Sequence, residues 1–201
     1  MIDVLTQDDA LVLRTWRPGD LDAMTRLLND PESRRWNPPM EALGPDRAAE
    51  RLAKAVQSAV DDDPTSFVVA GLGDPDRALG SIDFRRDLPL PPFSVVDVGY
   101  GVLPEARGRG VATGALRLLS AWVLSPAGMN LERVQLDHAV ENVASCRTAE
   151  RAGFVREGVR ARFLPLQDGP DAPVVLHDTC LHGLVRPRDD GEGDGEGDGE
   201  G

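Results

Sequence analysis

The sequence predicts an α+β fold in which helices pack against a mostly antiparallel sheet. Short apolar segments with strand character alternate with longer segments whose apolar residues repeat at helical spacing. Two strand candidates, 66–72 and 79–85, are joined by a Gly-Asp-Pro-Asp turn, which suits an antiparallel pair. One helix candidate in the second half lies between two strand candidates, as in a β-α-β crossover.

Proline, glycine and aspartate mark most boundaries of the expected elements. Pro18 ends the first strand, Gly19-Asp20 opens the first helix, and Asp30-Pro31 ends it. Gly153 follows the last helix, where a C-cap glycine is expected. The expected strands are 11–16, 66–72, 79–85, 95–103, 133–138, 154–162 and 174–184. The first expected helix begins at Gly19-Asp20 and ends before Asp30-Pro31. Further helices are expected at about 46–60, 110–124 and 142–152, with one additional turn at 32–36.

Charge separates an expected single domain, 1–188, from an acidic tail, 189–201. The tail is a Gly/Asp/Glu repeat with seven acids and no base, and we expect it to be disordered because it has nothing to bury. The formal net charge of −12 overstates the charge of the domain, where 27 acidic residues face 22 basic ones. Its net charge of −5 argues against a nucleic-acid partner, because phosphate contacts need clustered Lys and Arg.

Two further classes of protein are excluded. Cys146 and Cys180 are too few for a secreted scaffold held together by disulfides. The N-terminus carries no basic-then-apolar signal, and no apolar run approaches the roughly 18 residues of a membrane span. We therefore expect a cytoplasmic protein with no membrane partner.

Residues 97–113 carry the strongest functional signal, because a strand runs into a two-glycine turn that opens a helix. The first turn of a helix leaves its backbone N–H groups without internal partners, and the helix dipole adds partial positive charge there. Gly108 and Gly110 let a phosphate approach the backbone, and Arg107 and Arg109 add full positive charge. The segment therefore predicts a phosphate or pyrophosphate site.

The segment alone does not identify the ligand. A P-loop is excluded, because no Gly-Lys-Ser/Thr follows the glycines. A dinucleotide-binding fingerprint fits poorly, because its third glycine is due at Thr113 and Gly114 comes one place late. A short strand-to-helix connection, with glycines for steric reasons alone, is the alternative.

Residues 107–112, Arg-Gly-Arg-Gly-Val-Ala, match the Arg/Gln-x-x-Gly-x-Gly/Ala signature of the GNAT acetyltransferases. Residues 142–154 resemble the Asn-x-Ala-Ser-x-Arg…Glu-x-x-Gly-Phe pattern of the RimJ- and RimL-like branch of this family. A weaker similarity runs from Arg14 to Trp36, through Arg-Pro-x-Asp and Asn-Asp-Pro-Glu. The resemblance covers about 10–184 and implies a GNAT-like three-layer fold, with six to seven strands and helices on both faces.

The resemblance implies an N-acetyltransferase that uses acetyl-CoA as acetyl donor and a primary amine as acceptor, either a protein N-terminus or a small molecule. Family members bind the coenzyme A pyrophosphate on the 107–112 signature and the pantetheine beside the preceding strand. The implied cofactor residues are Val102, Leu103, Arg107, Gly108, Arg109, Gly110, Val111, Ala112, Thr113 and Asn142. Asn142 also fits a helix N-cap, and Val102 and Leu103 also fit the sheet core.

Direct attack of a neutral amine on the thioester needs an acid for the departing thiolate and a base for the amine proton. Many family members carry Tyr where this chain has Ala149, so Ser145 is the candidate acid here. The alternative for Ser145 is an ordinary small helix residue. A backbone N–H near Val102 or Leu103 would stabilise the oxyanion.

Asp97, Asp137 and His138 are the candidate bases. Asp97 occupies a position that is often acidic in the RimJ- and RimL-like branch. His138 has a suitable intrinsic pKa, but it shares a strand face with Val134 and Leu136, so a core position is the alternative. Structural roles compete with catalysis for all three candidates.

Glu32, Arg35 and Trp36 lie in the segment that shapes the acceptor pocket in family members. A hydrophobic plug with snorkelling neighbours is the alternative for Trp36. No metal is expected, because strand alternation points Cys180 away from His177 and nothing completes a site.

Two other functions compete with acetyl transfer. A non-catalytic acyl-CoA-binding module is the first, because the family tyrosine is missing and no base is obvious. A different nucleotide-binding fold is the second. Cys146 is interpreted as small core filler and not as a nucleophile, because no paired base is evident. The oligomeric state is open, with a homodimer as one option.

Overall fold

The computed structural model describes residues 3–86, 95–169 and 171–187. Its strands are β1 Val4–Gln7, β2 Leu11–Arg14, β3 Ser66–Gly71, β4 Asp74–Arg85, β5 Val95–Val102, β6 Arg133–Ala139, β7 Val155–Gln167 and β8 Val174–Val185. Its helices are α1 Leu21–Asn29, α2 Pro31–Arg35, α3 Pro45–Val60, α4 Val111–Leu124 and α5 Val143–Arg151, with short 3-10 helices η1 Pro18–Asp20 and η2 Pro104–Ala106. None of the described helices is both long and apolar enough to cross a membrane. The proline-rich loop 89–92 and the acidic tail 189–201 lie outside the described residues.

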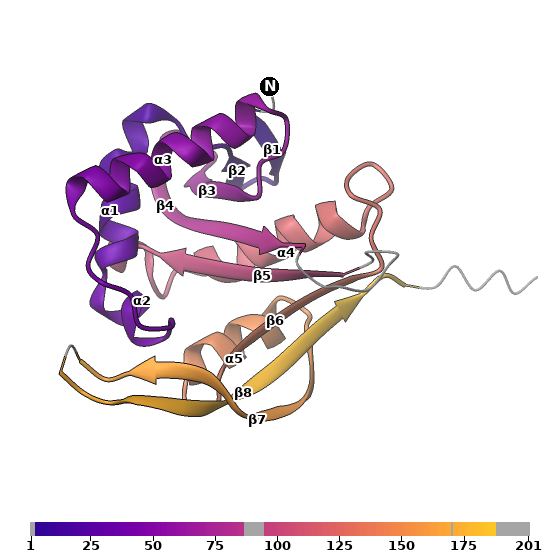
Figure 1. Ribbon diagram of the computed structural model, residues 1–201. Helices are drawn as coiled ribbons and strands as arrows, with labels where there is room; N and C mark the ends of the chain where they lie inside the picture. Colours follow the sequence, from indigo (N-terminus) through magenta and orange to yellow (C-terminus); the bar gives the residue numbers. More distant parts are fainter. Residues whose placement is uncertain (1–2, 87–94, 170, 188–201) are drawn as a thin grey trace, which may run out of the picture.

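The eight described strands form one sheet in the order β1-β2-β3-β4-β5-β6-β8-β7 (Figure 1). Neighbouring strands are antiparallel except β5 and β6, which are parallel and connected through α4. The α+β fold and its β-α-β crossover are confirmed. The expected number of six to seven strands is too low. The edge strand β1 was missed because it has only four residues and no alternation of buried and exposed side chains.

Two strands are longer than the sequence predicts. β4 begins at Asp74, so only residues 72–73 connect it to β3, in place of the expected Gly-Asp-Pro-Asp turn. β4 pairs with β5 only from Gly80 onward, so Pro75, which lacks an N–H, lies where β4 has a single neighbour. β7 continues to Gln167 because it forms a long hairpin with β8.

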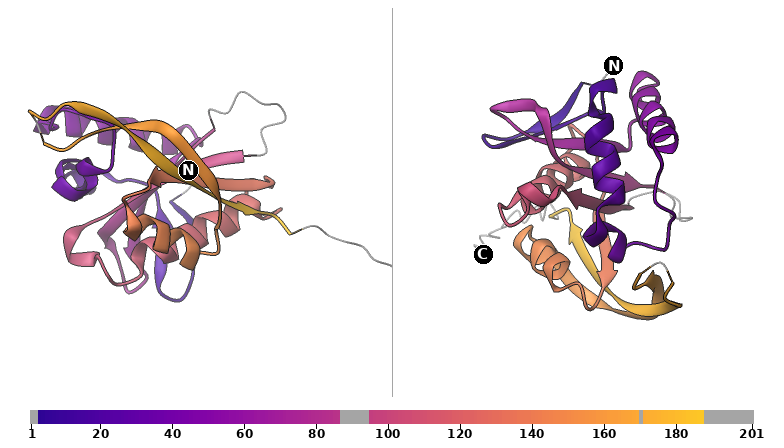
Figure 2. Two further views of the ribbon diagram at one scale, coloured as in Figure 1. Left: turned by 90° about the horizontal axis from the view of Figure 1, so that it is seen from below. Right: turned by 90° about the vertical axis from the view of Figure 1, so that its left-hand side faces the viewer.

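Alternating side chains divide the core into two layers, one on each face of the sheet. On β3, Phe67 and Val69 belong to the layer that contains α4 and α5 residues. Val68 and Ala70 belong to the layer that contains α1 and α3 residues. Figure 2 shows the two groups of helices on opposite sides of the sheet. The three-layer arrangement with helices on both faces is therefore confirmed.

A buried ion pair ties β2 to the start of α1. The guanidinium of Arg14 donates two hydrogen bonds of 2.8 Å to the two carboxylate oxygens of Asp20, and the side chains are 1% and 7% exposed. Arg14 Nε donates to the Pro75 carbonyl at 2.7 Å, and the Arg17 N–H donates to the Asp20 carboxylate at 2.8 Å. The Arg-Pro-x-Asp segment thus supplies the carboxylate that neutralises a buried guanidinium.

β5 and β6 diverge toward their C-terminal ends, as Figure 1 shows. Their pairing is limited to Val95, Val96 and Asp97 opposite Arg133, Val134 and Gln135. Among the described residues, the rest of β5 pairs only with β4, and the rest of β6 pairs only with β8. This divergence leaves an opening in the sheet beside the starts of α4 and α5.

Candidate functional site

The first turn of α4 is open and uncapped. Gly110 precedes the helix as its N-cap with a φ of 80°, and Gly108 has a φ of 70°. Both conformations favour glycine. No described side chain caps this helix, and a Cβ on either glycine would meet no described atom within 4 Å. Close packing therefore does not explain the glycines, and the first N–H groups of α4 are well placed for an anion.

A pocket of about 400 Å³ adjoins this end of α4. Three arginines, Arg109, Arg117 and Arg151, line it together with Gly110 and Thr113. The other lining residues are Asp8, Ala10, Leu11, Val111 and Gly114. Three guanidinium groups against one carboxylate, beside a helix N-terminus, suit an anionic ligand.

The Arg107 side chain is bonded to groups outside this pocket. Its guanidinium pairs with the buried carboxylate of Asp30, which is the N-cap of α2, and its Nε donates to the Val102 carbonyl at 3.1 Å. Burial acts to raise the pKa of Asp30, but hydrogen bonds from Ser33 and Arg107 outweigh it and hold that pKa below its usual range. Because Asp30 neutralises the Arg107 guanidinium in this arrangement, added charge from Arg107 at the phosphate site stays a prediction.

The backbone of Val102, and not that of Leu103, faces the opening. The Leu103 N–H donates to the Leu79 carbonyl at 2.9 Å, and the Leu103 carbonyl accepts from the Ala106 N–H at 2.9 Å. Successive residues of a strand direct their backbone groups to opposite edges, so Val102 points away from β4 and toward the opening. Both polar groups of the Leu103 backbone are already bonded, so Val102 is the better placed of the two, and a cofactor contact at Leu103 stays a prediction.

A pair of hydroxyl groups lies between the unpaired part of β5 and α5. Tyr100 Oη and Ser145 Oγ are 2.9 Å apart, and both side chains are half-buried. Asn142 caps α5, because its side-chain oxygen accepts from the Ser145 N–H at 3.1 Å. The N-cap interpretation of Asn142 is confirmed, and its amide nitrogen points to no described partner.

Tyr100 was not predicted as a site residue. Burial raises its pKa, and hydrogen bonds to Ser145 and Thr148 only partly oppose this, so the phenol stays protonated at neutral pH. Residues two apart on a strand direct their groups the same way, so the candidate Val102 could have pointed to Tyr100 on β5. The sequence gives no sign of where β5 leaves β6, and that departure is what places Tyr100 at the opening.

A family comparison agrees with this geometry. The model of the acetyltransferase (GNAT) domain matches residues 10–155. The chain belongs to the GNAT acetyltransferases. The matched range includes the divergent strands, the open start of α4 and all of α5.

Named relatives of this GNAT chain include ribosomal-protein acetyltransferases. YdaF of Bacillus subtilis, whose name places it provisionally among ribosomal N-acetyltransferases, is 32% identical over 96 residues, 48% of this chain and 48% of YdaF. The match thus spans about half of that relative. The ribosomal-protein-S5-alanine acetyltransferase of Vibrio fischeri has a TM-score of 0.72 and 21% identity, over 92% of this chain and 96% of that one. RimJ of Mycobacterium smegmatis, solved with CoA-disulfide, has a TM-score of 0.68 and 22% identity, over 87% of this chain and 81% of that one.

Two candidate bases of this GNAT chain are held by other side chains. Asp97 accepts a hydrogen bond of 3.0 Å from Gln135 in the paired part of β5. It lies about 16 Å along the strand from Val102, at about 3.3 Å per residue. Asp137 forms an ion pair of 3.4 Å with Arg160. Base catalysis by Asp97 stays a prediction and requires bridging water.

His138 lies in the core, as the alternative for this residue expects. It is 6% exposed and lies on β6 near Cys146 of α5. Its Nδ1 donates to the Ala139 carbonyl at 2.8 Å, and burial lowers its pKa although this hydrogen bond opposes the change. This position favours a structural role, and a catalytic His138 stays a prediction.

Glu32, Arg35 and Trp36 form a contact group at the end of α2. Trp36 Nε1 donates to Glu32 at 2.8 Å, and the Arg35 guanidinium lies 4.8 Å from the Trp36 ring centroid. Arg35 and Trp36 line a pocket of about 120 Å³ with Glu141 and His177. Its other lining residues are Leu166, Gln167 and Asp168. Because Glu141 immediately precedes the N-cap of α5, the pocket adjoins the opening, and acceptor binding there stays a prediction.

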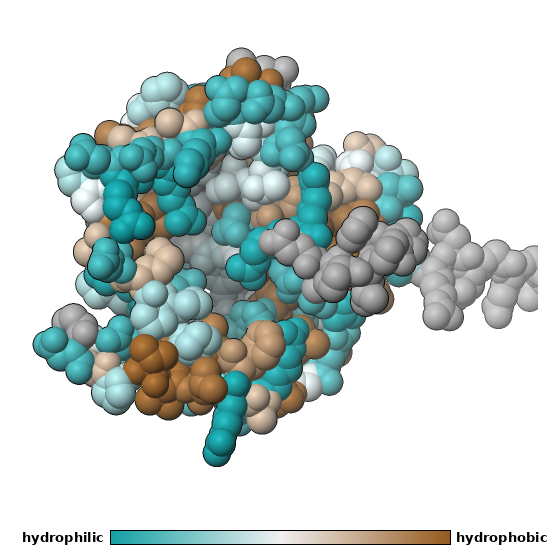
Figure 3. Space-filling model, viewed as in Figure 1, coloured by the Kyte–Doolittle hydropathy of each residue, from teal (hydrophilic) through white to brown (hydrophobic). Residues whose placement is uncertain are grey.

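The face in Figure 3 is hollowed between the α1–α3 helices and the β7–β8 hairpin, and mostly polar side chains surround the hollow. Apolar side chains gather over the hairpin at the lower edge of this view. The exposed large apolar residues of the hairpin include Val159, Phe163, Val174, Val175 and Leu176. A homodimer stays a prediction.

Proposed function

We propose that this chain transfers the acetyl group of acetyl-CoA to a primary amine. The observation that carries the proposal is the open, uncapped start of α4 beside the opening between β5 and β6. The positive helix end would hold the pyrophosphate, and the opening would receive the pantetheine. Membership of the GNAT family supports this use of the two features.

Each reaction step has a candidate group, and all of these groups except Asp97 lie at the opening. The amine nitrogen attacks the thioester carbonyl, forming a C–N bond, and the oxyanion accepts a hydrogen bond from the Val102 N–H. The C–S bond then breaks, and the thiolate takes a proton from Ser145. Tyr100 resupplies that proton through their 2.9 Å contact and regains its own from solvent water. The second amine proton leaves through water toward Asp97.

The acceptor is proposed to enter past the α2 contact group. Glu32 hydrogen-bonds Trp36, and Glu141 and Asp168 line the adjoining pocket, so carboxylates outnumber the one arginine there. Such a surface attracts a protonated amine before it loses a proton for attack. The names of the ribosomal relatives favour the α-amine of a protein N-terminus over a small-molecule amine.

Replacing Gly110 by Asp tests the cofactor site, with Gly110→Asn as the matched control. Both residues tolerate the left-handed backbone and have the same size, so they differ in charge alone. We expect isothermal titration to show acetyl-CoA binding at least about tenfold weaker to the Asp variant than to the Asn variant. The reason is that the added carboxylate competes with the pyrophosphate for the positive helix end.

Equal affinities of the two variants for acetyl-CoA would contradict the assignment of the pyrophosphate to the start of α4. A thiol-release assay with N-terminal peptides and polyamines then tests turnover. Tight acetyl-CoA binding without thiol release across this panel would identify a non-catalytic acyl-CoA-binding module instead.

A further inference from the structure

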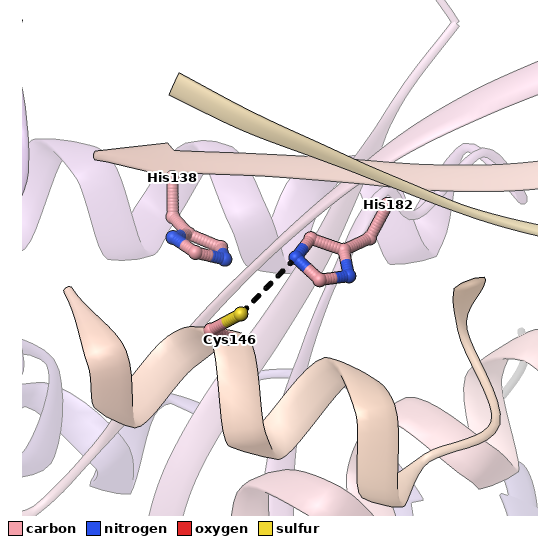
Figure 4. A group of neighbouring side chains, drawn as sticks. All are labelled: His138, Cys146 and His182. Atoms are coloured by element: carbon pink, nitrogen blue, oxygen red, sulfur yellow. Dashed lines mark hydrogen bonds between the residues drawn. The ribbon is translucent and has the colours of Figure 1, made fainter. Parts of the chain in front are cut away.

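Three potential metal ligands from three different elements meet behind the sheet. His138 on β6, Cys146 on α5 and His182 on β8 place ligand atoms that all lie within 4.8 Å of one another (Figure 4). Cys146 Sγ lies 3.6 Å from His182 Nε2, and the two imidazoles stack with centroids 5.1 Å apart. Sequence analysis missed this group, because 36 residues separate Cys146 from His182.

The Nε2 atom of His138 has a free lone pair that can bind a metal ion. His138 Nδ1 lies 2.8 Å from the Ala139 carbonyl, which only accepts, so we assign the ring proton to Nδ1. His138 Nε2 is then a bare acceptor, and it is buried with no hydrogen-bond partner among the described residues. A metal-bound histidine usually has this arrangement, with the far nitrogen donating to a backbone carbonyl.

His182 completes the arrangement from the neighbouring strand. Its side chain has no exposed surface, and its Nε2 faces the Cys146 sulfur. Its Nδ1 is also buried without a partner in the described part of the chain. The buried, unbonded Nε2 of His138 is costly unless a ligand satisfies it, and His182 turns its own Nε2 toward the same sulfur.

The spacing suits tetrahedral zinc. With Zn–S of about 2.3 Å and Zn–N of about 2.0–2.1 Å, tetrahedral angles place sulfur and nitrogen about 3.6 Å apart. The Cys146–His182 separation has this value, and all three ligand atoms lie within 4.8 Å of one another. Charges of both signs lie near the three groups. The positive charge of Arg156 interacts electrostatically with all three, and the negative charge of Glu150 interacts with Cys146 and His182.

We propose that His138, Cys146 and His182 form a binding site for a divalent zinc-type cation, with water as the fourth ligand. Binding displaces the thiol proton of Cys146 to solvent and forms one Zn–S and two Zn–N bonds. The metal would link β6, α5 and β8 behind the opening and so fix the helix that carries Ser145. This site does not depend on the acetyl-transfer proposal.

Zinc titration of the full chain tests the site, with Cys146→Ala as the key variant. Alanine suits a helix, and Cys146 is only partly buried, so this variant is expected to fold. His177→Ala is the matched control, because His177 is the one histidine outside the group. We expect one Zn²⁺ per chain in the wild type and the control, and binding at least about 100-fold weaker in Cys146→Ala.

Two further readouts keep the proposal open to refutation. Co²⁺ should give a thiolate charge-transfer band in the wild type and none in Cys146→Ala. Zn²⁺ should raise the melting temperature of the wild type and His177→Ala, but not of Cys146→Ala. Absence of stoichiometric Zn²⁺ binding to the folded wild type, or equal binding by Cys146→Ala, would overturn the site.

Discussion

Replacing Tyr100 by phenylalanine is expected to lower kcat for acetyl transfer by about 100-fold, the lower end of what a positioned acid contributes. The ring and its packing remain, so the affinity for acetyl-CoA should stay nearly unchanged. What is lost is the hydroxyl that lies 2.9 Å from Ser145 Oγ and resupplies its proton. Steady-state kinetics with a peptide amine, alongside titration with acetyl-CoA, measures both quantities. A wild-type kcat in this variant would remove Tyr100 from the mechanism.

A double-mutant cycle decides whether the two hydroxyls act as one relay. If they do, Ser145→Ala, Tyr100→Phe and the double variant should all lose a similar amount of kcat, because the second change removes nothing further. Independent roles would instead multiply the two losses. Ser58→Ala, which removes a helix hydroxyl bonded only to the Ala55 carbonyl, is the control and should leave kcat unchanged.

The pH profile provides an independent check on Tyr100. Its acid form is present below its pKa, and burial raises that pKa above the ordinary value of about 10. The relay therefore stays protonated through neutral pH, and loss of activity from its ionisation is expected only on the alkaline side of pH 10. A fall in kcat that begins near pH 8 would have to come from another group.

Local patterns were enough to predict the order of most elements and the glycine turn that opens α4, because both depend on neighbours in the chain. Gly108 and Gly110 need only their own backbone conformation, and Asn142 needs only the next turn of its helix. The open end of α4 could therefore be placed from a stretch of fewer than twenty residues.

The site residues that local patterns describe least well have partners that are distant in sequence. Arg107 was expected at the phosphate site, whereas its guanidinium pairs with Asp30, 77 residues away. Leu103 was expected to bind the cofactor, whereas its N–H donates to Leu79 on the neighbouring strand. Tyr100 reaches the opening only because the pairing of β5 with β6 ends at Asp97, three residues earlier. Single-sequence patterns carry no record of such long-range competition for hydrogen bonds.

Replacing Asp20 by asparagine is expected to lower the free energy of unfolding by about 3–5 kcal/mol, because it leaves the buried guanidinium of Arg14 without a counter-charge. Urea denaturation followed by circular dichroism measures the loss. Asp22→Asn is the control, since Asp22 is 83% exposed, 3.8 Å from Arg26, and should change stability by less than about 1 kcal/mol. The double variant Arg14→Met with Asp20→Leu removes both charges, so most of the stability should return. Equal losses in Asp20→Asn and Asp22→Asn would mean that the Arg14 charge is compensated by its carbonyl partners alone.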